Sequence, residues 1–178
     1  WDSQTGRIVT QFSGTNQSGH TNRVRTITFS LDGTLIASGG ADGRIVIWNV
    51  ANSTQQARWD AHVDGVNALV FTQNGQFFFF FGENGQIILW NHLTGELVQN
   101  YSGHGGAVNS LAFNNDGTLF ASGSDDDRVG VWSISDGFIK FLSGHNGDVL
   151  SVAFSPTAAS RLLSGSADDT IRLWDVLN

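Results

Sequence analysis

A tryptophan returns every 42 residues along this chain of 178 residues. The tryptophans in step are Trp48, Trp90, Trp132 and Trp174, and one more, Trp1, precedes the first of them by 47 residues. Histidines keep the same step, 28, 28, 28 and 29 residues before those tryptophans, at His20, His62, His104 and His145. A fixed period of this length is typical of repeat architectures, in which each unit buries its apolar face against the next unit.

The composition is that of a globular chain with an acidic surface. Hydrophobic residues make up 40% of it, charged residues make up 14%, and the formal net charge is −7. An acidic surface favours basic peptides or basic protein faces, so we expect protein or peptide partners, with no nucleic acid and no membrane. The chain has no cysteine, which excludes a disulfide framework and a cysteine zinc site.

The chain opens on Trp1-Asp2 and holds no methionine at any position. This opening matches the end of a repeat whose start is missing, so we expect a piece of a longer polypeptide. The absence of a targeting segment then carries little weight. An intracellular location, cytoplasmic or nuclear, is the expectation.

One period divides into four short strands, as the third period shows. Residues 107–113 predict a first strand, 119–123 a second, 129–133 a third and 138–142 a fourth. Turn residues separate these strands: Asn115-Asp116-Gly117, Asp125-Asp126-Asp127 and Ser135-Asp136-Gly137. Each period therefore predicts one antiparallel meander. Third strands such as Ile45-Val46-Ile47-Trp48 are apolar at consecutive positions, which indicates sheets that are buried on both faces.

Four motifs in fixed order now carry a family resemblance. In the third period they are Gly103-His104, Phe113 followed by Asp116-Gly117, Ser122-Gly123 followed by Asp126, and Trp132. At this spacing the chain resembles the WD-repeat β-propellers over essentially its whole length. The resemblance implies an all-β propeller of four-stranded antiparallel blades, in which the start of each sequence repeat supplies the fourth strand of the blade before it.

The resemblance also sets the expected organisation of the chain. We expect a single propeller domain or excerpt over residues 1–178, with repeats at about 15–60, 61–102, 103–143 and 144–178. Residues 7–12 are expected to be a fourth strand that belongs to a preceding or closing blade, while the last repeat lacks its own fourth strand. Four repeats of a larger propeller is the preferred interpretation, and seven blades would need roughly 290 residues. A four-blade ring, or two chains that complete an eight-blade ring, is the alternative.

Three periods hold histidine, serine, aspartate and tryptophan in fixed register. These sets are His20, Ser38, Asp42 and Trp48; His104, Ser122, Asp126 and Trp132; and His145, Ser164, Asp168 and Trp174. A Ser-His-Asp hydrolase site is one interpretation, but an active site is built once and these sets recur. The resemblance implies that they are buried structural tetrads linked by hydrogen bonds. The histidines fall on different blades without close ligand partners, so we expect neither a catalytic residue nor a metal or cofactor.

The second period departs from its sisters. It has a run of five phenylalanines, 77–81, where the others have sequences such as Leu35-Ile36-Ala37-Ser38-Gly39. Its tetrad is degenerate and consists of His62, Phe80, Asn84 and Trp90. Three interpretations stay open: a splayed blade that exposes an aromatic partner site, an altered but fully buried strand, and a run that does not represent the native residues. Overpacking a tight site costs about 1–3 kcal/mol.

The resemblance places partner binding on the loops at one end of the central channel. Side chains that follow the first-strand valine, or that precede the tetrad aspartate by one residue, match such positions. They are Arg25, Asn67, Asn109 and Leu150, and Ala41, Glu83, Asp125 and Ala167. Glu83 and Asp125 would form an acidic patch opposite Arg25.

Function is therefore expected to be that of a non-enzymatic scaffold that binds proteins or peptides in a multiprotein complex. Rigid repeats with variable loops are suited to this role. The alternative is a regulatory or sensor propeller attached to a signalling enzyme, an ATPase or a kinase, in the missing part of the chain. Further blades would come from the same longer chain or from a second copy.

Overall fold

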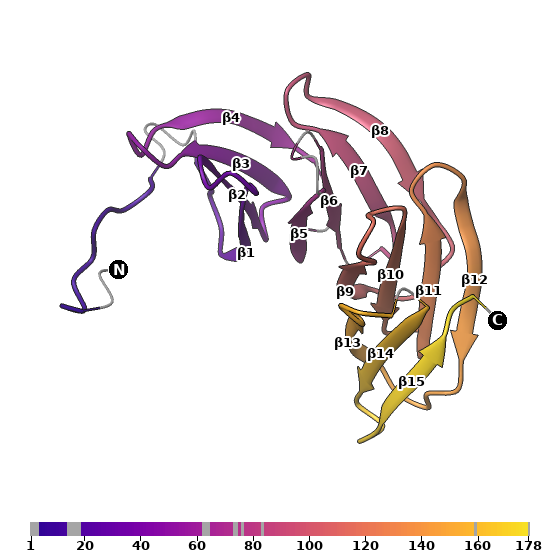
Figure 1. Ribbon diagram of the computed structural model, residues 1–178. Coiled ribbons are helices and arrows are strands. Elements are labelled where there is room, and N and C mark those ends of the chain that lie inside the picture. The colour runs from indigo at the N-terminus through magenta and orange to yellow at the C-terminus, as the bar shows by residue number, and fades with distance from the viewer. Residues whose placement is uncertain are drawn as a thin grey trace.

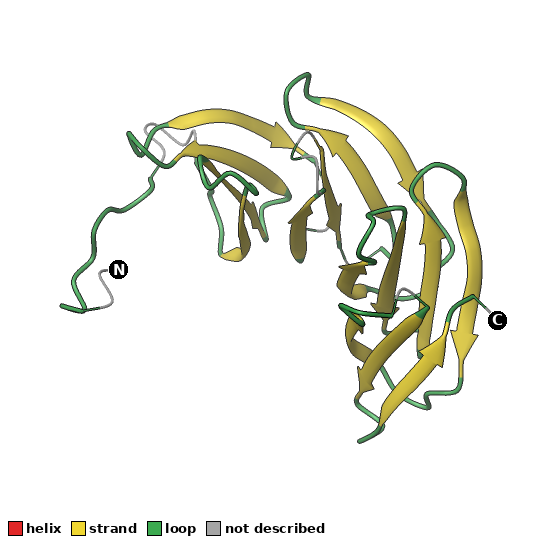
Figure 2. Ribbon diagram, in the orientation of Figure 1, coloured by secondary structure: helices red, strands yellow, loops and turns green. Residues whose placement is uncertain are grey.

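The computed structural model describes residues 4–13, 19–61, 65–72, 75, 77–82, 84–158 and 160–177, and at positions 77, 78 and 80 it describes the backbone alone. Within these ranges every regular element is a β-strand, and the strands form four antiparallel sheets that follow one another along an arc (Figures 1 and 2). The architecture is therefore all-β, as the repeat pattern predicts. We call each sheet a blade and number the blades 1 to 4 along the chain.

Blades 1 and 2 have four strands each. Blade 1 contains β1 (Val24–Phe29), β2 (Leu35–Gly40), β3 (Arg44–Asn49) and β4 (Gln55–Asp60). Blade 2 contains β5 (Ala68–Phe71), β6 (Phe77–Phe81), β7 (Ile87–Asn91) and β8 (Glu96–Tyr101). In both blades the strands lie in sequence order, with the first strand toward the inside of the arc and the fourth on its outer side (Figure 1).

Blade 3 has four strands and blade 4 has three. Blade 3 contains β9 (Val108–Phe113), β10 (Leu119–Ser124), β11 (Arg128–Ser133) and β12 (Gly137–Ser143). Blade 4 contains β13 (Val149–Phe154), β14 (Arg161–Ser166) and β15 (Ile171–Asp175). The four strands expected for the third period match blade 3 to within one residue at each end. In the described part of the chain, β15 has a partner strand only on the β14 side.

The first turn of a blade is fixed by an aspartate and a glycine. Asp32 accepts hydrogen bonds from the Ser30 hydroxyl at 2.6 Å and from the Thr34 backbone N–H at 3.0 Å. Gly33 has a φ of 69°, which a residue without a Cβ adopts at no steric cost. Asp116 and Gly117 repeat this arrangement in blade 3. The local sequence therefore sets the register between the first and second strands.

The core lies between the blades. Ala37, Ile45 and Ile47 of blade 1 are 0–2% exposed and pack against Val66, Leu69 and Phe71 of blade 2. Comparable clusters join blade 2 to blade 3 and blade 3 to blade 4. Blades 2 and 3 are covered on both sides, which explains why a third strand is apolar at consecutive positions rather than at alternate ones.

Two segments bear on the sequence predictions. Residues 7–12 are predicted to be a strand, but here they take part in no strand pairing and form an extended tail before blade 1 (Figure 1). The physical reason is that a strand needs a neighbour, and the described chain places no sheet edge beside this segment. The phenylalanine run does form a strand, β6, which pairs with β5 and β7. Phe79 and Phe81 are 0% and 2% exposed, as expected for an altered but buried strand.

Candidate functional site

The residues expected to form tetrads come together in blades 1, 3 and 4. In blade 3 the Trp132 indole N–H donates to Ser122 Oγ at 2.7 Å, and His104 Nε2 lies 2.6 Å from the same oxygen. His104 Nδ1 lies 2.9 Å from Asp126 Oδ2, which also accepts the Gly105 backbone N–H at 2.9 Å. The chain of bonds therefore runs from the third strand through the second strand to the two loops at one end of the blade.

The proton positions in this chain of bonds follow from what each group can do. An ionised carboxylate only accepts, so His104 Nδ1–H donates to Asp126. Nε2 of the neutral ring must then accept from the Ser122 hydroxyl, whose oxygen accepts from Trp132. Burial lowers the pKa of His104 and outweighs the raising effect of Asp126. Burial also opposes ionisation of Asp126, but hydrogen bonds from Gly105 and His104 outweigh it and hold the pKa of this carboxyl below its usual value.

The other two sets have the same geometry. In blade 1, Ser38 Oγ is 2.8 Å from both His20 Nε2 and Trp48 Nε1, and His20 Nδ1 is 3.1 Å from Asp42 Oδ1. In blade 4 the corresponding distances from Ser164 Oγ are 2.7 Å to His145 and 2.8 Å to Trp174, with His145 Nδ1 2.8 Å from Asp168 Oδ2.

These sets do not offer a nucleophile to a substrate. Ser38, Ser122 and Ser164 are only 4%, 0% and 1% exposed. Each serine hydroxyl is engaged by the histidine and by the indole of its own blade. Buried polar groups satisfied in this way rigidify their surroundings, which is a structural role.

The degenerate tetrad of blade 2 lacks the central serine hydroxyl, because Phe80 stands at the position of Ser38, Ser122 and Ser164. His62 lies outside the described residues, as does the side chain of Phe80. Asn84 accepts the Gln86 backbone N–H at 3.0 Å within its own turn, and the Trp90 ring packs against Trp59 with centroids 6.3 Å apart.

The residues expected to bind partners lie on the inner strands or in the loops at the tetrad end of the blades. Arg25 Nη1 donates to Asn67 Oδ1 at 2.6 Å, which links blade 1 to blade 2. Asn109 donates to Asp125 Oδ1 at 2.7 Å and to the Val149 carbonyl at 3.1 Å, which links blade 3 to blade 4. We call Arg25, Asn67, Asn109 and Asp125 the loop rim. Its hydrogen bonds lie within blade 3 and between neighbouring blades, and Arg25 and Asp125 remain exposed.

The remaining expected positions are less informative. Leu150 is 55% exposed at the matching position of blade 4. Ala41 and Ala167 are tied through their backbone N–H groups to the Arg23 and Asp148 carbonyls, as Asp125 is to Ala107. Glu83 lies outside the described residues, so its part in an acidic patch stays a prediction.

A small cavity opens at the inner side of the arc between blades 2 and 3. Its volume is about 180 Å³, and its lining includes Leu69, Val70, Phe81, Asn109 and Leu111. Phe81 occupies the position at which blades 1 and 3 have Gly39 and Gly123. A valine side chain of the next blade packs directly against each of these glycines. The ring is larger than that site, so it holds the inner strands of blades 2 and 3 apart. The sequence feature associated with this cavity is the phenylalanine run, which differs from the equivalent segments of the other three periods.

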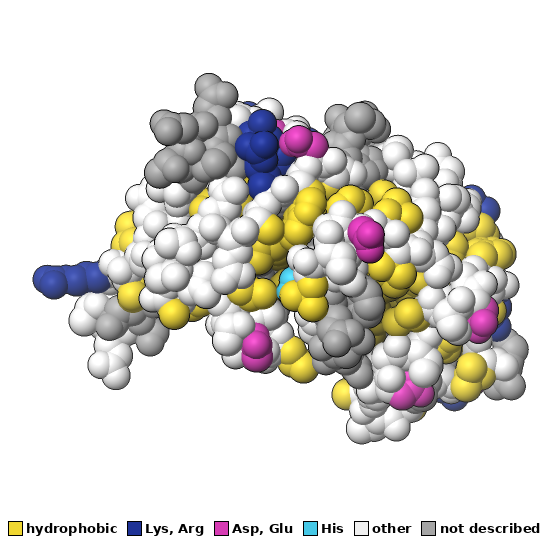
Figure 3. Space-filling view, turned by 90° about the horizontal axis from the view of Figure 1, so that it is seen from above, with side chains coloured by type: hydrophobic (Ala, Val, Ile, Leu, Met, Phe, Trp, Pro, Cys, Tyr) yellow, Lys and Arg dark blue, Asp and Glu magenta, His cyan; other side chains and the backbone are white. Residues whose placement is uncertain are grey.

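At the tetrad end of the blades, exposed acidic and basic residues lie on different parts of the arc. Exposed acidic residues there are Asp125, Asp148 and Asp169 in blades 3 and 4, and exposed basic residues are Arg23 and Arg25 in blade 1. In the view from above, the dark blue side chains of lysine and arginine are separated from one another and form no continuous stripe (Figure 3). Hydrophobic side chains lie between the polar ones. Over the described residues, no helix is long and apolar enough to cross a membrane.

Comparisons with known proteins agree with this geometry. The family described as "WD domain, G-beta repeat" (WD40) matches residues 11–49, 53–91, 95–133 and 137–175. Solved structures of U3-55K and of the RRP9 WD40 repeats superpose with TM-scores of 0.82 and 0.81 at 21% identity, over 89% of this chain and 50% of each of those chains.

Curated relatives match over shorter stretches. The small ribosomal subunit protein RACK1 of Caenorhabditis elegans is 53% identical over 36 residues, which is 20% of this chain and 11% of that protein. RACK1 of Schizosaccharomyces pombe is 48% identical over 40 residues, or 22% and 13%. The chain thus matches about half the length of its structural relatives and a small part of these curated ones.

Proposed function

Because this chain belongs to the WD40 repeat family, we propose that it is a non-enzymatic scaffold whose loop rim binds a protein or peptide during assembly of a multiprotein complex. The observation that carries the proposal is the loop rim itself. Its polar side chains are fixed by hydrogen bonds within and between blades, yet two of them, Arg25 and Asp125, remain exposed. Preorganised polar groups on a rigid support bind a partner with little loss of side-chain freedom.

The exposed charges at the tetrad end of the blades indicate the charge of the peptide that would bind there. Blades 3 and 4 present Asp125, Asp148 and Asp169, so this side attracts lysine and arginine side chains. Blade 1 presents Arg23 and Arg25, which suit a carboxylate at the other end of the bound segment. Membership in a multiprotein complex and an intracellular location are parts of the same proposal, and the ribosomal subunit protein among the curated relatives supports them by analogy.

The test is a binding screen with labelled peptides of equal length and opposite charge, read by fluorescence anisotropy. Cationic peptides should bind the wild-type chain, and a double variant, Asp125→Asn with Asp148→Asn, should weaken that binding about tenfold or more. Asp32→Asn with Asp116→Asn is the matched control, because it also removes two negative charges, from turns at the opposite end of blades 1 and 3, and asparagine still supports those turns. Equal binding of anionic and cationic peptides would contradict the proposal.

A further inference from the structure

Blades 2 and 3 are spread apart at the inner edge of their junction. Where blade 1 meets blade 2, the backbone N–H of Val66 donates to the Gly40 carbonyl at 3.0 Å. The equivalent bond between blades 2 and 3 runs from Val108 to the Gly82 carbonyl and is 3.3 Å long. It lies next to Phe81, whose ring fills the position of a glycine in blades 1 and 3. The cavity of about 180 Å³ described above opens at this place.

The same junction lacks a side-chain acceptor that joins blades 3 and 4. There the backbone N–H of Val152 in β13 donates to Ser110 Oγ in β9 at 3.2 Å. One period earlier the two positions are Leu111 in β9 and Ala68 in β5. Because alanine has no hydroxyl, Ala68 cannot accept the Leu111 N–H as Ser110 accepts that of Val152. The inner strands of blades 2 and 3 are therefore held together by fewer bonds of this kind.

The cavity between these strands has apolar walls on both sides. Ala68 and Val70 are two residues apart on β5, so they share the face of the strand that turns to blade 3. Phe81 closes the cavity on the blade 2 side, and Leu111 faces these residues from β9. Apolar cavities of about 150 Å³ hold a benzene-sized group, so this one is large enough for a single apolar side chain.

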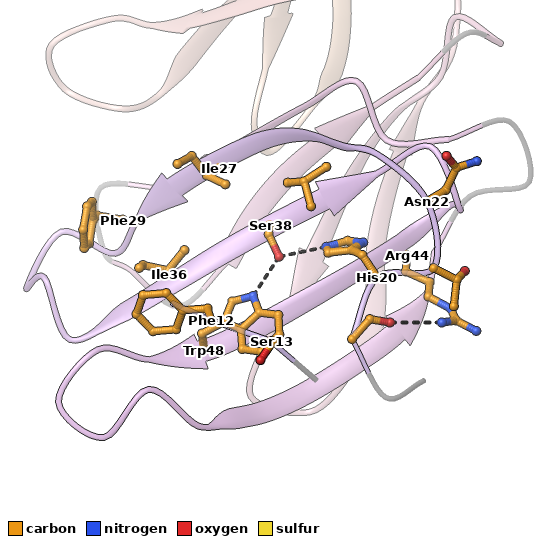
Figure 4. Close-up of a pocket in the computed structure, with 13 residues that line it drawn as sticks. Phe12, Ser13, His20, Asn22, Ile27, Phe29, Ile36, Ser38, Arg44 and Trp48 are labelled. Atoms are coloured by element: carbon orange, nitrogen blue, oxygen red, sulfur yellow. Dashed lines mark hydrogen bonds between the residues drawn. The ribbon is translucent and has the colours of Figure 1, made fainter. Parts of the chain in front are cut away.

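Leu111 keeps part of its side chain uncovered, although it lies between two blades. Its equivalents at the other two junctions, Leu69 and Val152, are each 6% exposed. Leu111 is only partly buried. The equivalent residue of blade 1 is Ile27, which Figure 4 shows among the residues of an open hollow. The uncovered surface of Leu111 belongs to the wall of the cavity.

A fixed polar group and a carboxylate stand at the edge of the cavity. Asn109 lies in its lining and donates from Nδ2 to Asp125 Oδ1 at 2.7 Å and to the Val149 carbonyl at 3.1 Å. Both partners only accept, so the amide nitrogen must face them, and the amide oxygen can accept an N–H of a bound peptide. Asp125 is exposed, and its second carboxylate oxygen can meet a cation.

We propose that this cavity is the specificity pocket of the loop rim and takes one leucine-sized aliphatic side chain of the bound peptide, with a lysine or arginine beside it that pairs with Asp125. This role rests on the proposed function, because the loop rim has to bind a cationic peptide before the pocket can add to that binding. The occupant is a peptide side chain because the apolar walls, the amide of Asn109 and the carboxylate of Asp125 match an apolar residue, a backbone N–H and a basic residue in succession.

The first test compares two peptides on the wild-type chain. In one, lysines and serines flank a central leucine; in the other, asparagine replaces the leucine. Asparagine is similar in size to leucine, but its amide loses hydrogen bonds with water in an apolar pocket. Fluorescence anisotropy should show the leucine peptide bound about tenfold more tightly or more. Equal affinity for the two peptides would overturn the pocket and leave the proposed function in place, whereas binding of neither would overturn both.

The second test fills the pocket. Ala68→Ile and Val70→Phe each add a strand-favouring side chain to its β5 wall, and each should abolish the preference for leucine while the asparagine peptide binds as before. Ser151→Ile is the matched control, because Ser151 is the exposed equivalent of Ala68 in blade 4, and it should keep the preference. Urea midpoints identify the folded variants, and one folded variant decides the question. A preference for leucine that survives in a folded pocket variant would place the leucine elsewhere and overturn the proposal.

Discussion

Trp132 and Ser122 are joined by a hydrogen bond of 2.7 Å from the indole N–H to the hydroxyl oxygen, in a part of blade 3 where the two residues are 1% and 0% exposed. The serine is the centre of its tetrad, since the imidazole of His104 reaches the same oxygen. The Trp132 indole and the His104 imidazole therefore share one hydrogen-bond partner, the hydroxyl of Ser122.

Ser122→Ala should lower the free energy of unfolding by about 1–3 kcal/mol, because it leaves both the Trp132 N–H and His104 Nε2 buried without their partner. Urea denaturation monitored by tryptophan fluorescence measures this change. Ser102→Ala, at an exposed position after β8, should change the free energy by less than about 0.5 kcal/mol. Equal effects of the two substitutions would show that the tetrad contributes nothing to stability.

Stability should fall in two steps as the pH is lowered. Burial lowers the pKa of His104, so between its unfolded value of about 6.5 and its lower folded value the unfolded chain binds more protons and stability falls. The carboxyls of Asp42, Asp126 and Asp168 also have lowered pKa values, so their contribution is complete above about pH 4 and is lost below it. Urea midpoints at pH 7.5, 5.5 and 3.5 test both steps. A midpoint that stays level from pH 7.5 to 5.5 would rule out the first step.

Tyr101 should titrate far above its usual value. Burial raises the pKa of this hydroxyl to about 12, and the hydroxyl donates to the Ile134 carbonyl at 2.7 Å. Because the chain has one tyrosine, absorbance at about 295 nm reports this group alone. The folded chain should titrate near 12 and the urea-unfolded chain near 10. A raised folded pKa means that this stabilisation is complete below pH 10 and is lost toward pH 12. Titration near 10 in both states would contradict the buried position.

Phe79→Ala should lower the free energy of unfolding by about 3–5 kcal/mol, although alanine is the residue that blades 1 and 3 have at this position. Phe79 is 0% exposed, and its ring lies 4.8 Å from Phe120 and 5.3 Å from Phe113, so the substitution opens a cavity between blades 2 and 3. Leu93→Ala, at a residue that is 71% exposed in the turn after β7, is the control and should be nearly neutral. A gain in stability in Phe79→Ala would show that the ring overpacks its site.

Much of the fold can be predicted from the sequence, because the same pattern of strands and turns recurs in four successive periods. The turn residues Asp116 and Gly117 and the apolar third strands place each strand within a residue or two. The phenylalanine run could not be interpreted from the sequence, since a strand that is buried and a strand that splays its blade have the same pattern of side chains. Their difference lies in how Phe79 and Phe81 pack against the next blade.

The loop rim was predicted only in part. The positions of Arg25 and Asn109 follow from the repeat register, but their bonds to Asn67 and to the Val149 carbonyl join different blades. The sequence contains no signal for such contacts, because they depend on the rotation between neighbouring sheets.

The sequence units at 53–91, 95–133 and 137–175 each contribute their first strand to one sheet and their other three to the next. Duplication or deletion of one such unit therefore leaves every surviving junction with the same chemical partners. The number of blades can therefore change by one at a time during evolution, without a new kind of contact between neighbouring blades.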